Sequence, residues 1–276
     1  MSKRRGRGVS RLQALSFVRR GVTPLALAAT FALPLAARAA EPTCQTAQEL
    51  ARFSNPLHHL AQKLTGRDSV TIVAIGSSST QGAGASSPAA NYPSRLRAEL
   101  QKLYPHNKIV VINQGIGGEE VPDMLKRFDD AVVKAKPDLV LWQLGTNSVV
   151  RGHMSSEQGA LIRAGLKKIR STGADVVLID PQFAPKVIAK PESERMVELI
   201  SVTAKQENVD LFRRYDVMKR WHDVDHLRFE AFVSPDGLHM NDWSYACMAK
   251  GLGQAIAEAA QRPVVSATVS ARAKAQ

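Results

Sequence analysis

The chain has 276 residues, of which 44% are hydrophobic, enough to build the core of one large domain or two small ones. Its formal charge of +12 and its isoelectric point near 10.0 would suit a protein that binds nucleic acid. Eight of the 37 Lys and Arg residues, however, lie among the first 40 residues, where there is no acidic residue. The remaining 29 basic residues face 25 acidic ones, so a nucleic-acid partner is not indicated.

Residues 1–39 have the pattern of a secretory signal peptide. A basic head precedes an apolar run over residues 21–40, which contains prolines, is short for a membrane span and ends in Ala37-Arg38-Ala39. We therefore expect cleavage near Ala39, a periplasmic or secreted location and no stable membrane insertion of the mature protein. An uncleaved membrane anchor is the alternative.

The two cysteines, Cys44 and Cys247, are too few and too far apart in the sequence to predict a metal site. Export would allow them to form a single disulfide. Two unpaired, buried thiols are an equally good interpretation.

Strand and helix patterns alternate along the rest of the chain. The five apolar runs are short and rich in β-branched residues without strict alternation, as expected for strands buried on both faces. They predict an α/β domain over residues 67–262 with a central parallel five-stranded sheet, after an N-terminal segment over 40–66 and before a disordered tail over 263–276. The expected strands are 70–75, 108–113, 138–145, 174–180 and 209–212, and the expected helices are 92–104, 119–135, 155–173, 191–208 and a last one that opens at Asn241 or Asp242.

The loop after the first expected strand reads Gly76-Ser77-Ser78 and continues with small residues. A phosphate-binding loop would need a lysine here, and a dinucleotide site would need an acidic residue where the second strand ends in Asn113 and Gln114. A flexible linker is the simplest alternative. A serine nucleophile on a tight strand-to-helix turn also fits, because ligands bind at the carboxyl ends of parallel strands.

Three further segments carry polar residues or glycines where they would meet that loop. The second strand leads into "NQGIGGEE" with Gly117 and Gly118, and the third leads into "GTN" with Asn147. Asp236 precedes His239 by three residues, just before the last helix. Taken singly, these segments would be a tight turn, a helix cap and a turn with a solvated histidine.

Together the four segments resemble the motif blocks of the SGNH or GDSL hydrolases, a family of serine esterases, and they occur in order across residues 70–260. The resemblance implies a three-layer α/β/α, flavodoxin-like fold and catalysis without a metal or cofactor. It implies that Ser78 is the nucleophile, that His239 is its base and that Asp236 orients the base. It also implies an oxyanion hole formed by Ser78, Gly118 and Asn147. Ser77 stands where the family has an aspartate, so Ser77 and Ser79 remain alternative nucleophiles.

These expectations combine into an exported serine esterase that works through an acyl-enzyme. Export favours O-acetyl groups on polysaccharide or peptidoglycan, so an acetylated glycan is the expected substrate. A lysophospholipase or thioesterase of the same family is one alternative, and a non-catalytic glycan-binding module is another. The loop over residues 180–192 is a candidate wall of the substrate pocket, and the segment "WHDVDH" over 221–226 could instead supply metal ligands.

Overall fold

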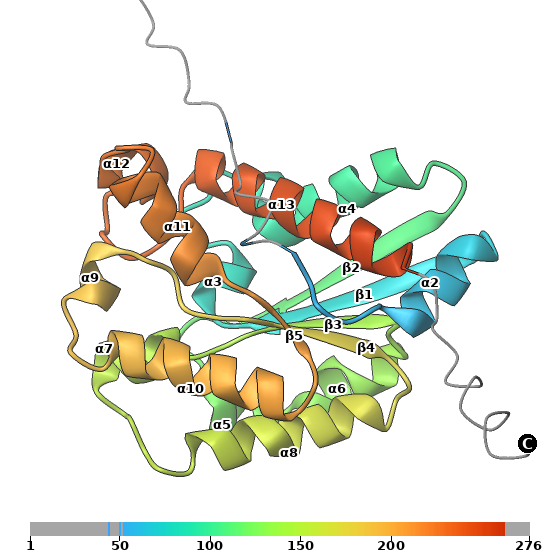
Figure 1. The fold of residues 1–276 in the computed structure, drawn as a ribbon, viewed down its shortest axis with the longest axis horizontal. Coiled ribbons are helices and arrows are strands. Elements are labelled where there is room, and N and C mark those ends of the chain that lie inside the picture. Colours follow the sequence, from blue (N-terminus) through green and yellow to red (C-terminus); the bar gives the residue numbers. More distant parts are fainter. Residues whose placement is uncertain (1–43, 45–49, 51, 263–276) are drawn as a thin grey trace, which may run out of the picture. The chain divides into compact units, whose positions relative to one another are not determined.

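A five-stranded parallel sheet lies at the centre of the computed structural model, which describes residues 44, 50 and 52–262 (Figure 1). The strand order is β2-β1-β3-β4-β5, the order of the flavodoxin-like folds. The predicted signal peptide and the predicted disordered tail lie outside the described residues. The strands are β1 (Ser69–Gly76), β2 (Lys108–Gly115), β3 (Leu139–Gln143), β4 (Asp175–Ile179) and β5 (Asp210–Phe212).

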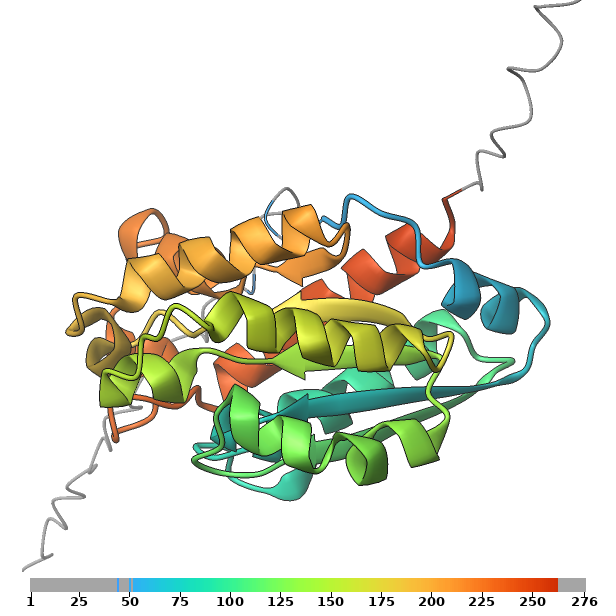
Figure 2. The same cartoon turned by 90° about the horizontal axis from the view of Figure 1, so that it is seen from below.

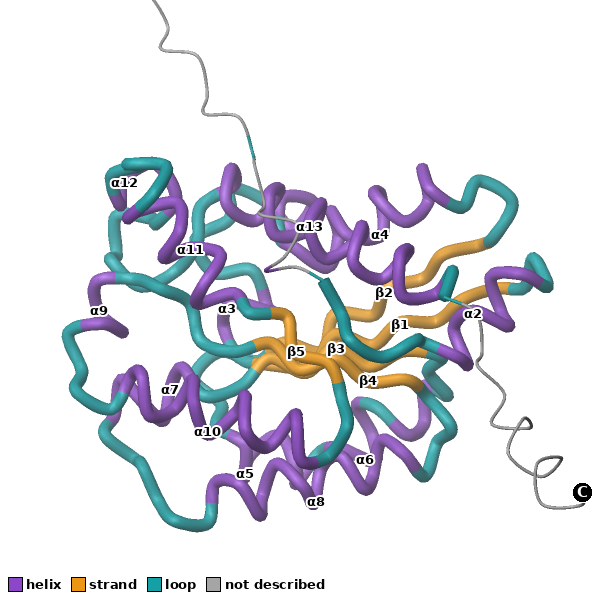
Figure 3. The backbone as a smooth tube through the Cα atoms, in the orientation of Figure 1, coloured by secondary structure: helices purple, strands orange, loops and turns teal. Residues whose placement is uncertain are grey.

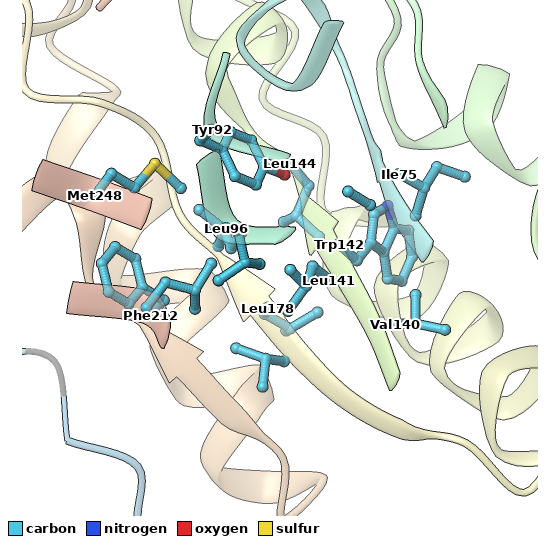
Figure 4. Packing of buried hydrophobic residues seen from close by; sticks show 14 of the residues in the cluster. Ile75, Tyr92, Leu96, Val140, Leu141, Trp142, Leu144, Leu178, Phe212 and Met248 are labelled. Carbon is cyan, nitrogen blue, oxygen red and sulfur yellow. The ribbon is translucent and has the colours of Figure 1, made fainter. Parts of the chain in front are cut away.

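The expectation of strands buried on both faces is confirmed for β3, of which every residue is buried. It is wrong for the edge strand β2, in which Ile109 alone is buried, because no strand pairs with its outer side. Figure 4 shows Tyr92 and Leu96 on one side of β3 and Trp142 on the other. The ring of Trp142 packs edge-on against Phe128 at 5.3 Å between centroids. Apolar side chains therefore cover both faces of the sheet, and polar groups are left to its edges.

Helices cover the two faces of the sheet in separate layers (Figures 1 and 2). The last helix begins as predicted, because Asn241 accepts a hydrogen bond from Ser244 N at its first turn. Helices α4 and α13 form one layer, and α5, α6, α8 and α10 form the other. The helices are α2 (His58–Thr65), α3 (Ser78–Gln81), α4 (Tyr92–Leu103), α5 (Val121–Lys126), α6 (Phe128–Ala131), α7 (Thr146–Arg151), α8 (Gln158–Arg170), α9 (Pro185–Ile188), α10 (Ser193–Gln206), α11 (Arg214–Asp223), α12 (Phe229–Phe232) and α13 (Asp242–Ala260), with 3₁₀ turns η1 (Pro88–Ala90) and η2 (Val133–Ala135).

The single helix expected over residues 119–135 is wrong, because the segment breaks into α5, α6 and η2. The first break falls at Arg127, whose backbone leaves the helical region at φ −108° and ψ 9°. Its side chain turns back to donate to the carbonyl oxygen of Gln114 at 2.8 Å. A contact with the end of β2 thus accompanies the end of α5, and the hydrophobic pattern gives no sign of it.

Three carboxylates at the amino-terminal edge of the sheet hold the segment that precedes β1. Asp210 accepts from Ser54 N at 2.7 Å, and Asp175 accepts from Leu60 N at 2.9 Å. Asp138 accepts from Thr71 N and contacts His59 Nε2, both at 2.8 Å. His59 is half-buried by this contact with Asp138.

The structure also pairs Cys44 with Cys247 of α13 in a disulfide, with 5.4 Å between their Cα atoms. Of the two interpretations that the sequence left open, the structure thus contains the disulfide. Within the described residues, no helix is long and apolar enough to cross a membrane.

Candidate active site

Helix α3 follows β1 at the carboxyl-terminal edge of the sheet (Figure 3), and Ser78 is its first residue. The turn is fixed by Gln143, the last residue of β3. Its side-chain oxygen accepts from Ser77 N at 2.9 Å, from Ser77 Oγ at 3.1 Å and from Thr80 Oγ1 at 3.2 Å. The strand beside β1 therefore holds the turn that presents Ser78.

The structure brings together the three residues that the sequence singled out, although 161 positions separate the serine from the histidine. His239 Nε2 lies 2.7 Å from Ser78 Oγ, and His239 Nδ1 lies 2.5 Å from Asp236 Oδ2. Both contacts are of hydrogen-bond length. A histidine between a serine hydroxyl and a carboxylate is the arrangement that activates a serine in several unrelated folds.

Asp236 is held by its own turn as well as by the histidine ring. Its Oδ1 accepts from Ser234 Oγ at 2.7 Å, from Leu238 N at 2.8 Å and from His239 N at 2.9 Å. Partial burial raises the pKa of Asp236, but the hydrogen bonds from His239, Ser234 and Leu238 outweigh it and bring the pKa well below its usual range. Asp236 is therefore ionised at neutral pH, as a group that orients a histidine must be.

The structure distinguishes the three consecutive serines. Ser77 is buried, with 2% of its surface exposed, and Ser79 is buried completely. Within the described residues, Ser78 is the one of the three whose hydroxyl contacts His239. The geometry thus favours Ser78 over its two neighbours.

The loop between β2 and α5 lies beside Ser78. Gly118 adopts a φ of +82°, a conformation that glycine tolerates best. Asn147 Nδ2 donates to the carbonyl oxygen of Glu119 at 2.8 Å, so its side chain reaches the same loop. The helix-cap interpretation of Asn147 is wrong, because Gly145 occupies the cap position of α7 and Asn147 lies within the helix. The amide has a second hydrogen that could serve an oxyanion.

An ion pair that sequence reasoning missed secures this loop. Arg127 Nε lies 2.8 and 2.9 Å from the two carboxylate oxygens of Glu119, and both side chains are mostly buried. The two residues stand eight positions apart across the start of a helix, a spacing that predicts no contact. The ion pair becomes evident only in the folded structure, where the loop brings the two side chains together.

A buried glutamine in the expected pocket wall was also missed. Gln182 accepts from Thr146 Oγ1 at 2.9 Å, and its Nε2 donates to the carbonyl oxygen of Leu238 at 3.1 Å. Thr146 precedes Asn147, and Leu238 precedes His239. One side chain thus links the helix that carries Asn147 to the turn that carries the histidine.

Gly84 provides a second link, between the loop that follows α3 and the histidine turn. A Cβ at this position would lie 2.3 Å from the carbonyl oxygen of Met240 and 2.9 Å from His239 Cβ. Any larger residue would therefore push the two segments apart.

The segment over 221–226, considered above as a metal site, has a different role in the structure. His222 contacts Asp223 at 2.8 Å and stacks on Phe229 with ring centroids 4.5 Å apart. In the part of the chain that the structure describes, no three His, Cys, Asp or Glu side chains gather as a metal site would require.

Known proteins share sequence and fold with this chain. The model of the Non-GDSL lipase-like family matches residues 43–262. A curated acetylxylan esterase from Geobacillus stearothermophilus is 42% identical over 52 residues, which cover 19% of this chain and 24% of that protein. The chain thus matches only about a quarter of the length of this relative.

Solved structures with the same fold are more distant in sequence. A two-domain esterase active on acetylated mannans has a TM-score of 0.66 at 19% identity, over 79% of this chain and 58% of that one. A catalytic mutant of the acetylxylan esterase Axe2 from Geobacillus stearothermophilus has a TM-score of 0.59 at 20% identity, over 68% of this chain and 94% of that one. At these identities the likeness shows the fold alone, and it confirms the flavodoxin-like, three-layer prediction.

Replacement of Asn147 by alanine tests its expected role as an oxyanion donor. Loss of a donor that acts in the transition state should lower turnover on a short-chain ester by about 100- to 1000-fold with little change in substrate binding. The lost bond to Glu119 should cost about 1 kcal/mol of folding stability. Ser148→Ala on the same helix is the matched control. A lower urea midpoint with turnover within a few-fold of wild type would assign Asn147 to loop tethering only.

Replacement of Gln182 by leucine should separate the two halves of the site. Because small misplacements of catalytic groups are costly, we expect turnover to fall by about tenfold or more while KM changes little. Thr146→Val, which removes only the contact at the α7 end, should have a smaller effect in the same direction. Steady-state kinetics and urea unfolding of both variants provide the measurement. Unfolding at lower urea with unchanged turnover would contradict a positioning role.

Proposed function

The chain belongs to the Non-GDSL lipase-like family, and from this premise we propose that it is a serine esterase that removes O-acetyl groups from carbohydrate. The observation that carries the proposal is the pair of contacts that join Ser78 to His239 and His239 to Asp236. The activities of the similar proteins, on acetylated xylan and acetylated mannans, support the choice of acyl group and substrate class.

In the proposed reaction, Ser78 Oγ attacks the ester carbonyl carbon while its proton passes to His239 Nε2. Asp236 stabilises the imidazolium that forms. The amides of Ser78 and Gly118 and the side chain of Asn147 donate to the oxyanion. The bond to the sugar oxygen then breaks, and the sugar leaves with the proton from His239.

The acyl-enzyme is resolved by the same groups. His239 takes a proton from water as the water oxygen attacks the acyl carbon, and it returns that proton to Ser78 as the bond to Oγ breaks. Acetic acid is released and the free serine is restored.

Alanine substitution at each of the three serines tests the proposal. Since the triad residues act as a unit, Ser78→Ala should reduce turnover on aryl acetates and acetate release from acetylated xylan or mannan by about 1000-fold or more, with the fold intact. Ser77→Ala and Ser79→Ala are matched controls that retain the nucleophile. Wild-type turnover in Ser78→Ala would overturn the assignment, and the absence of turnover in the wild-type protein itself would favour a glycan-binding module.

We further propose that the protein is exported and that residues 1–39 are removed. The basic head and apolar run support this, as does the pairing of Cys44 with Cys247, because disulfides persist in oxidising compartments.

Mass spectrometry of the protein from its native host, before and after alkylation without reductant, tests the export proposal. The mass should correspond to a chain that begins near Ala40, with neither cysteine alkylated. Recovery of the full-length chain from the membrane fraction would contradict cleavage. Alkylation of both cysteines would contradict an oxidising location.

A further inference from the structure

Arg151 lies beside the expected oxyanion hole, next to Gly118. It follows Asn147 by four residues in α7, so the two side chains share one face of the helix. Arg151 lies about one turn, or roughly 5.4 Å, farther along the helix axis. Its Nη2 lies 3.2 Å from the position that a Cβ would take at Gly118. The guanidinium therefore rests against the loop that faces Ser78.

Glu120 holds the guanidinium in this place. Its Oε1 accepts from Arg151 Nη1 at 2.8 Å and contacts His153 Nδ1 at 2.9 Å, and its Oε2 accepts from Ser148 Oγ at 2.9 Å. Burial raises the pKa of Glu120, but hydrogen bonds from Arg151, His153 and Ser148 outweigh it and lower the pKa overall. Glu120 is thus an ionised, mostly buried anchor, whereas 45% of the Arg151 side chain is exposed.

The anchor uses only one end of the guanidinium. Within the described residues, no side chain or carbonyl accepts a hydrogen bond from Nε or Nη2 of Arg151. These two nitrogens form an edge with parallel N–H donors, which matches the two oxygens of a carboxylate. The neighbouring Asp123 does not compete for this edge, because it pairs with Lys126 at 3.0 Å.

We propose that the substrate is an acetylated acidic glycan, and that the free edge of Arg151 binds the carboxylate of a uronic acid residue next to the ester. This inference rests on the proposed function and adds a substrate class to it. It also distinguishes this chain from the similar proteins described above, whose substrates, xylan and mannans, have neutral backbones.

Acetate release from partially acetylated polygalacturonate and from partially acetylated mannan tests the proposal. The wild-type protein should prefer the acidic glycan, and the preference should weaken as salt screens the charge. Arg151→Gln should lower kcat/KM on the acidic glycan by about tenfold more than on the mannan, mainly through KM. Arg151→Lys should recover part of the loss, because lysine keeps the charge but not the paired donors. Arg163→Gln, at an exposed site on α8, is the matched control.

Competitive inhibition gives an independent measurement that does not depend on the position of the acetyl group. Unacetylated oligogalacturonate should inhibit hydrolysis of an aryl acetate by the wild-type protein, with a Ki that rises about tenfold in Arg151→Gln. A neutral mannooligosaccharide should show no such difference between the two proteins.

The outcomes separate this inference from the function on which it rests. Equal activity on both glycans, or an equal loss on both in Arg151→Gln, would overturn the acidic substrate and leave the acetylesterase proposal standing. Hydrolysis of aryl acetates with no acetate released from either glycan would overturn both.

Discussion

The position of β1 between β2 and β3 is the constraint on which the candidate site depends. The chain leaves β1 toward one edge of the sheet to form β2, then returns past β1 to form β3, β4 and β5 on its other side. The loops after β1 and β3 therefore run to opposite sides of the sheet and leave a crevice between them at its carboxyl-terminal edge. Ligands bind in flavodoxin-like folds at such a switch point. Ser78 follows β1 and Asn147 follows β3, so the topology itself brings the nucleophile candidate and the oxyanion donor candidate to the same opening.

The topology places these loops at the same edge of the sheet, and amide side chains fix their positions there. Gln143 holds the serine turn, Gln182 joins α7 to the histidine turn, and Asn147 holds the loop of Gly118. An amide suits this task because it carries a donor and an acceptor without a charge. Gln182 uses both, since it accepts from Thr146 and donates to the carbonyl oxygen of Leu238. The loops that carry the reacting groups are thereby tied to buried strand and helix ends rather than to one another alone.

The sheet could be predicted from the sequence because it depends on local signals, whereas the candidate catalytic residues were indicated by the resemblance to the SGNH or GDSL hydrolases. The apolar runs mark the strands, and their alternation with helices leaves few topologies. Asp236 and His239 lie on one short turn, so their contact follows from spacing. Two links could not be predicted in this way, namely those formed by Gln182 and by the Glu119–Arg127 pair. They join residues that the sequence pattern does not place near each other. The break at Arg127 was missed for the same reason, since a long-range contact overrides the helical pattern there.

The two edges of the sheet have different tasks. At the amino-terminal edge, Asp138, Asp175 and Asp210 fasten the preceding segment, and nothing in their arrangement faces the candidate site. At the carboxyl-terminal edge, polar side chains converge on Ser78 and His239. Exposed side chains at the mouth of the site make fewer contacts with the core, so they can change at a small cost in stability. Arg151 stands at such a position, held by Glu120 but exposed toward solvent. The proposed binding of an acidic sugar thus depends on a residue at the rim of the site and not on the buried contacts that hold Ser78 and His239.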